Sequence, residues 1–170
     1  MIQYVSITPS MMSAVISHLR DSFFADEPLN KAVSLCERGE GHEALEMMCL
    51  ATMHDGYSIA AVEENELLGV SLNDKILECR IISVSAQARG KGVAKELMRK
   101  SLELAQAKGF KLFKADATGI YSQRVCSSLG LQAISTVRYD SYLDEDGDPV
   151  FNVEPPHKAL VIMVKKLEDD

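Results

Sequence analysis

The chain has 170 residues, 46% of them apolar, and a formal net charge of −7 at neutral pH. This length suffices to bury one hydrophobic core and the composition shows no break, so we expect a single domain over residues 1–170. The acidic balance argues against a nucleic-acid partner, which normally demands a basic face, and favours small cations such as amines.

The first half of the chain alternates between strand and helix patterns. An alternating segment predicts a strand over 2–7, and apolar residues recurring every four residues from Met11 to Phe23 predict a helix capped by Thr8 or Ser10. The segments expected next are a helix from Pro28 to the break at Gly39–Gly41, a helix around Ala44–Cys49, strands at 57–62 and 67–72 joined by the polar turn 63–66, and a strand at about 77–84.

The second half begins with a long amphipathic helix from Val93, which is expected to stop at Gly109. A strand at 110–115, a short helix at 121–129 and two strands at 131–139 and 159–167 are expected to follow. This order predicts an α+β fold with a central mixed, mostly antiparallel sheet flanked by helices.

The cysteines and the N-terminus indicate a cytoplasmic protein. Cys36, Cys49, Cys79 and Cys126 form no C-x-x-C pair and lie within apolar or helical patterns, so we expect reduced core residues. The N-terminus resembles a strand rather than a signal region, and no apolar run approaches ~20 residues. We therefore expect neither secretion nor a membrane span. We also expect the protein to be a monomer.

The segment Ile81–Ala94 runs from a buried-strand pattern into a Gly-spaced loop that opens the long helix. A helix start leaves backbone N–H groups unpaired and carries partial positive charge, and Gly90 and Gly92 allow close approach to the main chain. Arg89 and Lys91 add positive charge at the rim. We interpret this segment as a cradle for a pyrophosphate group.

Two common nucleotide motifs do not fit this loop. A dinucleotide fingerprint requires a third small residue where Lys95 stands, and a Walker loop requires glycine where Ser85 stands. The pattern Gln87-x-x-Gly90-x-Gly92 instead resembles the signature of the GCN5-related N-acetyltransferases (GNAT), which implies their acyl-CoA N-acyltransferase fold with acetyl-CoA as co-substrate. The cofactor-binding residues implied are Ser83, Val84, Gln87, Arg89, Gly90, Lys91, Gly92, Val93 and Ala94.

An acidic cluster between residues 140 and 148 invites a calcium-loop interpretation, but its spacing is wrong. If Gly147 took the obligatory glycine position, Tyr142 and Val153 would stand at the first and last ligand positions. We expect a solvated hairpin tip around Asp146-Gly147 and no metal site.

A second resemblance narrows the family. The run Phe23–Asn30 is similar to the Asp-Glu-Pro-Leu motif of the insect-type arylalkylamine N-acetyltransferases, the dopamine N-acetyltransferase group. Further matches are Tyr121–Val125 leading to Leu129-Gly130, and Pro156-His157. The resemblance implies acetylation of amines of the dopamine, serotonin, tyramine or octopamine type.

This resemblance makes Glu27 the general base, acting through ordered water in a direct, ternary-complex mechanism. Such a group is needed because an amine of pKa about 10 is protonated at neutral pH and cannot attack a thioester. The alternative is that Glu27 merely caps the helix that begins at Pro28.

The family also uses two hydroxyls, which fall on Thr118 and Ser122. Thr118 stands where serine is usual, and its methyl group restricts χ1. Many GNAT enzymes protonate the leaving thiolate with a tyrosine at the position of Cys126, so here Ser122 or a water is the better candidate. Alternatively, Ser122 satisfies backbone donors at a helix start.

His157 and Phe24 are expected to contact the acceptor, although loop histidines are often plain surface residues. His18 is expected to be structural or exposed. Relatives usually carry a longer excursion between Leu72 and Val84, so this chain is either trimmed or lacks a loop. Two rival functions stay open, a polyamine or other aliphatic amine N-acetyltransferase and a non-catalytic CoA-binding sensor.

Overall fold

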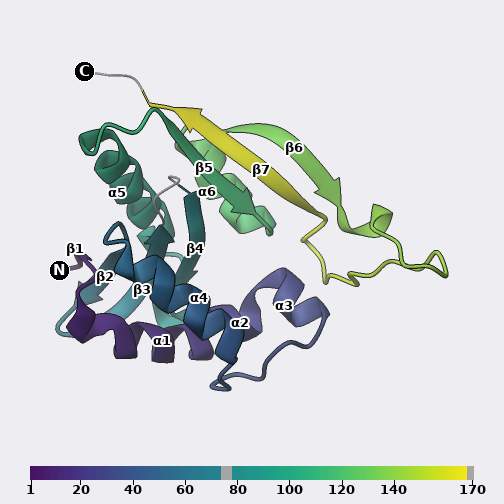
Figure 1. Ribbon diagram of the computed structural model, residues 1–170, viewed down its shortest axis with the longest axis horizontal. Helices are drawn as coiled ribbons and strands as arrows, with labels where there is room; N and C mark the ends of the chain where they lie inside the picture. Colours follow the sequence, from purple (N-terminus) through teal and green to yellow (C-terminus); the bar gives the residue numbers. More distant parts are fainter. Residues whose placement is uncertain (74–77, 168–170) are drawn as a thin grey trace.

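In the computed structural model, which describes residues 1–73 and 78–167, seven strands form one sheet in the order β1-β2-β3-β4-β5-β7-β6 (Figure 1). Neighbouring strands run antiparallel except the parallel pair β4–β5. The predicted mixed, mostly antiparallel sheet is thereby confirmed. The strands are β1 Gln3–Ser6, β2 Ile59–Glu63, β3 Glu66–Asn73, β4 Glu78–Val84, β5 Leu112–Ala117, β6 Gln132–Arg138 and β7 Ala159–Lys166.

Helices cover both faces of this sheet. Ala60 of β2 packs in the cluster that includes α1 and α4, whereas its neighbours Ile59 and Ala61 pack against α5, because successive strand residues point to opposite faces. The helix α6 packs on β5 and β7. The helices are α1 Met12–Asp21, α2 Phe23–Asp26, α3 Pro28–Ala32, α4 Glu43–His54, α5 Val93–Ala107 and α6 Ile120–Ser128, with short 3₁₀ turns η1 Pro9–Met11, η2 Ala86–Ala88 and η3 Tyr139–Ser141.

Two helical segments differ from the sequence prediction. The first helix does not continue to Phe23 but breaks at Ser22, whose hydroxyl donates to the carbonyl of His18 at 2.5 Å. A serine side chain competes in this way for helix backbone groups. The helix from Pro28 ends at Ala32 rather than at Gly39, and Ser34 follows with a left-handed φ of 50°.

The parallel pairing of β4 with β5 is short. It joins Glu78 to Lys114 and Cys79 to Ala115, after which the two strands diverge (Figure 1). Among the described residues, no strand pairs with the edge of β4 that faces β5 from Ile81 to Val84. Backbone groups on this part of the edge can therefore reach a ligand.

The connection between β3 and β4 is short, as the sequence indicates. β3 ends at Asn73 and β4 begins at Glu78. Residues 74–77, where part of the expected strand and of the questioned loop falls, lie outside the described residues.

Residues 139–158 form an arm that extends away from the sheet between β6 and β7 (Figure 1). At its tip Asp144 Oδ1 accepts hydrogen bonds from the backbone N–H groups of Asp146 and Asp148, and Leu143 bridges to Pro149. The expected hairpin tip is confirmed. In the described part of the chain, no helix has the length and apolar character needed to cross a bilayer.

Candidate active site

The loop between β4 and α5 has the geometry of an anion cradle. Gly90 and Gly92 adopt φ of 77° and 78°, and a Cβ added at either would meet nothing within 4 Å, so both face open space. Gly92 is the N-cap of α5, and no side chain caps the helix there. The side chain of Val93 is buried, so Val93 and Ala94 offer the site their backbone N–H groups.

Arg89 is held by an ion pair rather than standing free at the rim. Its Nη2 donates to Asp26 Oδ2 at 2.7 Å and its Nε to the carbonyl of Val84 at 3.4 Å. Asp26 also accepts from Arg38 at 2.6 Å. Burial alone would raise the pKa of Asp26, but the two arginines outweigh it and lower that pKa. The segment before Glu27 is thus tied to the phosphate loop.

The other predicted cofactor residues occupy the end of β4 and the loop. Gln87 is exposed, and its Nε2 donates to Glu66 Oε1 at 2.9 Å, whereas Lys91 extends into solvent. Ser83 is buried, with its hydroxyl in contact with His18 and Ser22. Ser83 can therefore serve a cofactor only through its backbone.

Glu27 uses its two carboxylate oxygens differently. As the N-cap of α3 it accepts at Oε2 from the backbone N–H of Asn30 at 2.8 Å. The residue is buried, and Oε1 has no hydrogen-bond partner among the described residues. A buried carboxylate oxygen without a donor is costly, so this atom is poised to accept from water or an ammonium group.

The turn from β5 into α6 brings together three predicted site residues. The Ser122 hydroxyl donates to the carbonyl of Gly119 at 2.8 Å and accepts from the backbone N–H of Gly119 at 3.4 Å, and the second bond is the one that the capping alternative expects. His157 Nδ1 accepts from the backbone N–H of Ile120 at 3.2 Å, so the proton of the neutral ring sits on Nε2. Thr118, partly exposed, immediately precedes this turn.

Gly119 is the meeting point of this turn with the Glu27 segment. A Cβ added there would lie 3.0 Å from His157 Nδ1 and 3.2 Å from Pro28 Cγ. Only glycine permits this approach without displacing its neighbours. Pro28, which follows Glu27, and His157 are far apart in the sequence, yet both pack against Gly119.

Sequence reasoning missed Tyr139. Its hydroxyl donates to the carbonyl of Thr118 at 2.5 Å, and its ring packs edge-on against Phe151 with centroids 6.2 Å apart. Burial, reinforced by the charge of Glu27, raises the pKa of Tyr139, which places the phenol in the electrostatic neighbourhood of the carboxylate. Tyr139 and His157 also line an open hollow of about 280 Å³ at the base of the arm. No local sequence pattern distinguishes this tyrosine.

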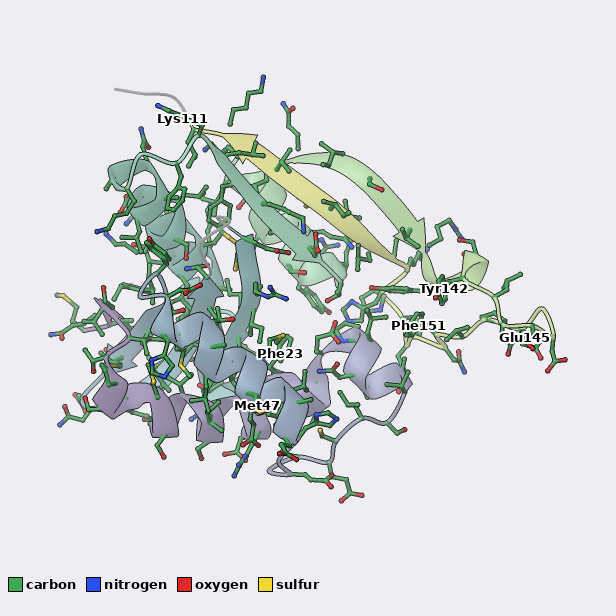
Figure 2. The ribbon with its side chains drawn as sticks, in the orientation of Figure 1. Phe23, Met47, Lys111, Tyr142, Glu145 and Phe151 are labelled. Carbon is green, nitrogen blue, oxygen red and sulfur yellow. The ribbon has the colours of Figure 1, made fainter. Side chains whose placement is uncertain are left out.

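The phenylalanine pair differs from expectation. Phe24, predicted to contact the acceptor, is fully buried in the core beside α1 and α4. Phe23, labelled in Figure 2, packs edge-on against it with ring centroids 6.4 Å apart and is only partly buried. Of the two rings, Phe23 is the one available to a ligand.

Comparisons with known proteins agree with this geometry. The model of the acetyltransferase (GNAT) family matches residues 13–130. The structure is similar to that of arylalkylamine N-acetyltransferase 2 from Aedes aegypti, with 38% identity, a TM-score of 0.95, and coverage of 98% of this chain and 99% of that chain. Because 99% of that solved chain is covered, it has no long insertion relative to this chain.

Two further solved structures share the fold at lower identity. The polyamine N-acetyltransferase of Drosophila melanogaster, which catalyses the formation of N-acetylagmatine, has 19% identity and a TM-score of 0.84 over 98% of this chain and 100% of that chain. Mosquito arylalkylamine N-acetyltransferase like 5b has 17% identity and a TM-score of 0.83 over the same shares of the two chains.

Proposed function

The chain belongs to the acetyltransferase (GNAT) family, and from this premise we propose that it acetylates the primary amine of an arylalkylamine of the dopamine, serotonin, tyramine or octopamine type. The broader activity, transfer of the acetyl group of acetyl-CoA to an amine, is that of the family. The proposal adds the aromatic acceptor, the general base and the order of chemical events.

The observation that carries the proposal is the buried Oε1 of Glu27, which accepts no hydrogen bond from the part of the chain that the structure describes. An amine of pKa about 10 must lose a proton before it can attack. Glu27 takes that proton, directly or through water, while its other oxygen stays bound to Asn30 and fixes the side chain. The carboxylate is thus anchored on one side and free on the other.

Acetyl-CoA would lie along the open edge of β4, with its pyrophosphate at the start of α5. The amine nitrogen attacks the thioester carbonyl, and backbone N–H groups near Val84 stabilise the oxyanion. Attack forms the C–N bond; collapse of the tetrahedral intermediate then restores the C=O bond, breaks the C–S bond and releases the CoA thiolate. The nitrogen, which carries an extra proton after attack, loses it as the amide forms, and Ser122 or a water that it orders passes that proton to sulfur.

Cys126 is unsuited to that last role. Its side chain is buried, and burial raises its pKa to about 11. The thiol belongs to the core between α6 and the sheet.

Two features support an aromatic acceptor. A relative with 38% identity over nearly the whole chain is named for arylalkylamines. The accessible ring of Phe23 and the aromatic lining at Tyr139 and Phe151 offer apolar surface to an aryl group. A polyamine acceptor is the second candidate, because the arm beside the site is strongly acidic and would attract a second ammonium group.

The test is release of CoA from acetyl-CoA, followed with a thiol reagent, against tyramine, dopamine, serotonin, histamine, spermidine, putrescine and agmatine. Preferred turnover of the aromatic amines supports the proposal. Faster turnover of spermidine or agmatine would replace it by the second candidate. Binding of acetyl-CoA without turnover of any amine would point to a CoA-binding sensor.

A further inference from the structure

Three polar side chains join the segment that carries Glu27 to the strand β4. His18 Nε2 lies 3.2 Å from Ser83 Oγ, and Ser83 Oγ lies 2.8 Å from Ser22 Oγ. Ser22 Oγ in turn lies 2.5 Å from the carbonyl oxygen of His18. Both serines are buried, with 4% and 7% of their surface exposed, so these contacts are shielded from water.

The direction of every hydrogen bond in this set follows from the number of protons. A carbonyl only accepts, so the single proton of Ser22 goes to His18 O. Ser83 must then donate to Ser22, and its oxygen must accept from His18. His18 therefore carries a proton on Nε2, and the three residues form a closed ring of hydrogen bonds that begins and ends at His18.

The position of this ring links the two halves of the candidate site. Ser22 stands at the break between α1 and α2. Asp26 N donates to Ser22 O at 2.8 Å and Glu27 N to Phe23 O at 3.0 Å, so a displacement of Ser22 is passed on to Glu27. Ser83 lies on β4 directly before Val84, where the open edge of the strand meets the phosphate loop.

We propose that the hydrogen-bond ring of His18, Ser22 and Ser83 sets the distance between Glu27 and the acetyl group on β4, which makes His18 a positioning residue for the transfer reaction. This inference rests on the proposed function and adds to it. Apolar packing at these three positions would fill the same space, but directional hydrogen bonds fix how the helix break sits on the strand. Burial lowers the pKa of His18, while its contact with Ser83 and the charge of Asp21 act in the opposite direction. The His18 ring carries a proton on Nε2 in its neutral form and in its charged form, so it can donate to Ser83 in either form.

The test compares His18→Gln with His18→Asn. The glutamine amide reaches about as far as Nε2 and can donate to Ser83, whereas the asparagine amide is one bond shorter. We expect His18→Asn and Ser83→Ala to lower kcat roughly tenfold or more, because small misplacements of reacting groups are costly. His18→Gln should stay within about threefold of the unmodified protein, with the KM for acetyl-CoA little changed in all three.

A double mutant separates positioning from a merely structural role. If the ring acts through Glu27, Ser83→Ala should cost little further activity in a Glu27→Ala background. Additive losses would contradict the inference, as would equal loss in His18→Gln and His18→Asn at equal stability in urea. Should Ser83→Ala fail to fold, the Gln and Asn pair decides.

The same data distinguish the two levels of the proposal. Full activity of Glu27→Ala, or no turnover by the unmodified protein, would overturn the proposed function and this inference with it. A strong loss in Glu27→Ala together with unchanged kcat in His18→Asn and Ser83→Ala would overturn the positioning role alone.

Discussion

The side chain of Glu27 both caps α3 and is the proposed general base. Oε2 caps α3 through Asn30, and Oε1 is buried and has no hydrogen-bond partner within residues 1–73 and 78–167. We predict that Glu27→Ala lowers kcat/KM by roughly 10²-fold or more, with near-normal affinity for acetyl-CoA. Loss of the cap should also cost about 1 kcal/mol of unfolding free energy.

Glu27→Gln is the matched control for this prediction. The amide oxygen can still accept from Asn30, so the unfolding free energy should stay near that of the unmodified protein, while the loss of the base keeps kcat/KM low. Kinetics and urea unfolding of both variants provide the measurement. An active glutamine variant would leave Glu27 with the cap alone.

His18 makes a separate prediction about stability. Because burial lowers its pKa, the unfolded chain binds a proton first as the pH falls below about 6.5. The folded state should therefore lose stability from that pH down to the lower pKa of the folded protein, and lose none above it. We expect His18→Gln to show a smaller drop in urea midpoint between pH 7.5 and 5.5. An equal drop would mean that His18 titrates normally.

Among the helices, α5 is the one whose first turn is proposed to bind the pyrophosphate of acetyl-CoA, and Gly92 is its N-cap. We predict that Gly92→Ala weakens acetyl-CoA binding, because the new Cβ enters the space of the pyrophosphate. Gly109→Ala is the control, since Gly109 has the same φ of 78° and open surroundings at the other end of the helix. Both variants should lose about 1 kcal/mol of stability.

Calorimetric titration with acetyl-CoA separates the two glycine variants. Reduced affinity in Gly92→Ala alone is the expected result. An equal loss of acetyl-CoA affinity in both variants would show that backbone strain, rather than contact with the ligand, governs the effect at Gly92.

The periodicity of apolar residues and the presence of turn-forming residues account for most of the helices and strands that were predicted correctly. The turn between β2 and β3 places Glu64 and Asn65 at φ of 50° and 67°, a two-residue hairpin that a polar stretch between apolar runs predicts well. The failures lie where side chains act on the backbone. Ser22 ends α1 through its hydroxyl, and Ser34 takes a left-handed conformation after α3, and neither event has a periodic signal.

The candidate site was predictable only where a motif is contiguous. The phosphate loop and Glu27 lie within short runs, so both can be proposed from the sequence; in the structure Gly92 is the N-cap of α5 and Glu27 is the N-cap of α3. Tyr139 meets Thr118, and Ser83 meets His18, across long separations in sequence. Such contacts depend on how the strands are ordered in the sheet, which composition and spacing do not specify. Phe23 and Phe24 show the same limit, because a one-residue difference decides which ring is buried.

In the whole molecule, negative charge is concentrated on the arm, residues 139–158, which lies beside the proposed acceptor site. The arm carries an exposed acidic tip at Glu145, Asp146 and Asp148 (Figure 2). Its base is joined to the site by the ion pair of Lys31 with Glu154 at 2.6 Å and by the contact of His157 with Ile120. A field of this sign should raise the local concentration of cationic amines and repel the phosphates of CoA.

Neutralising the tip tests this field. We predict that the triple variant Glu145→Gln, Asp146→Asn, Asp148→Asn lowers kcat/KM for a cationic amine by about two- to threefold at low ionic strength, and that the difference disappears near 0.5 M salt because screening shortens the range of the field. Asp144 is kept, since its carboxylate holds the turn. The KM for acetyl-CoA serves as the internal control and should fall or stay constant, because CoA is anionic. Identical salt dependence in the variant and the unmodified protein would show that the arm acts on the acceptor only through its contacts at the site.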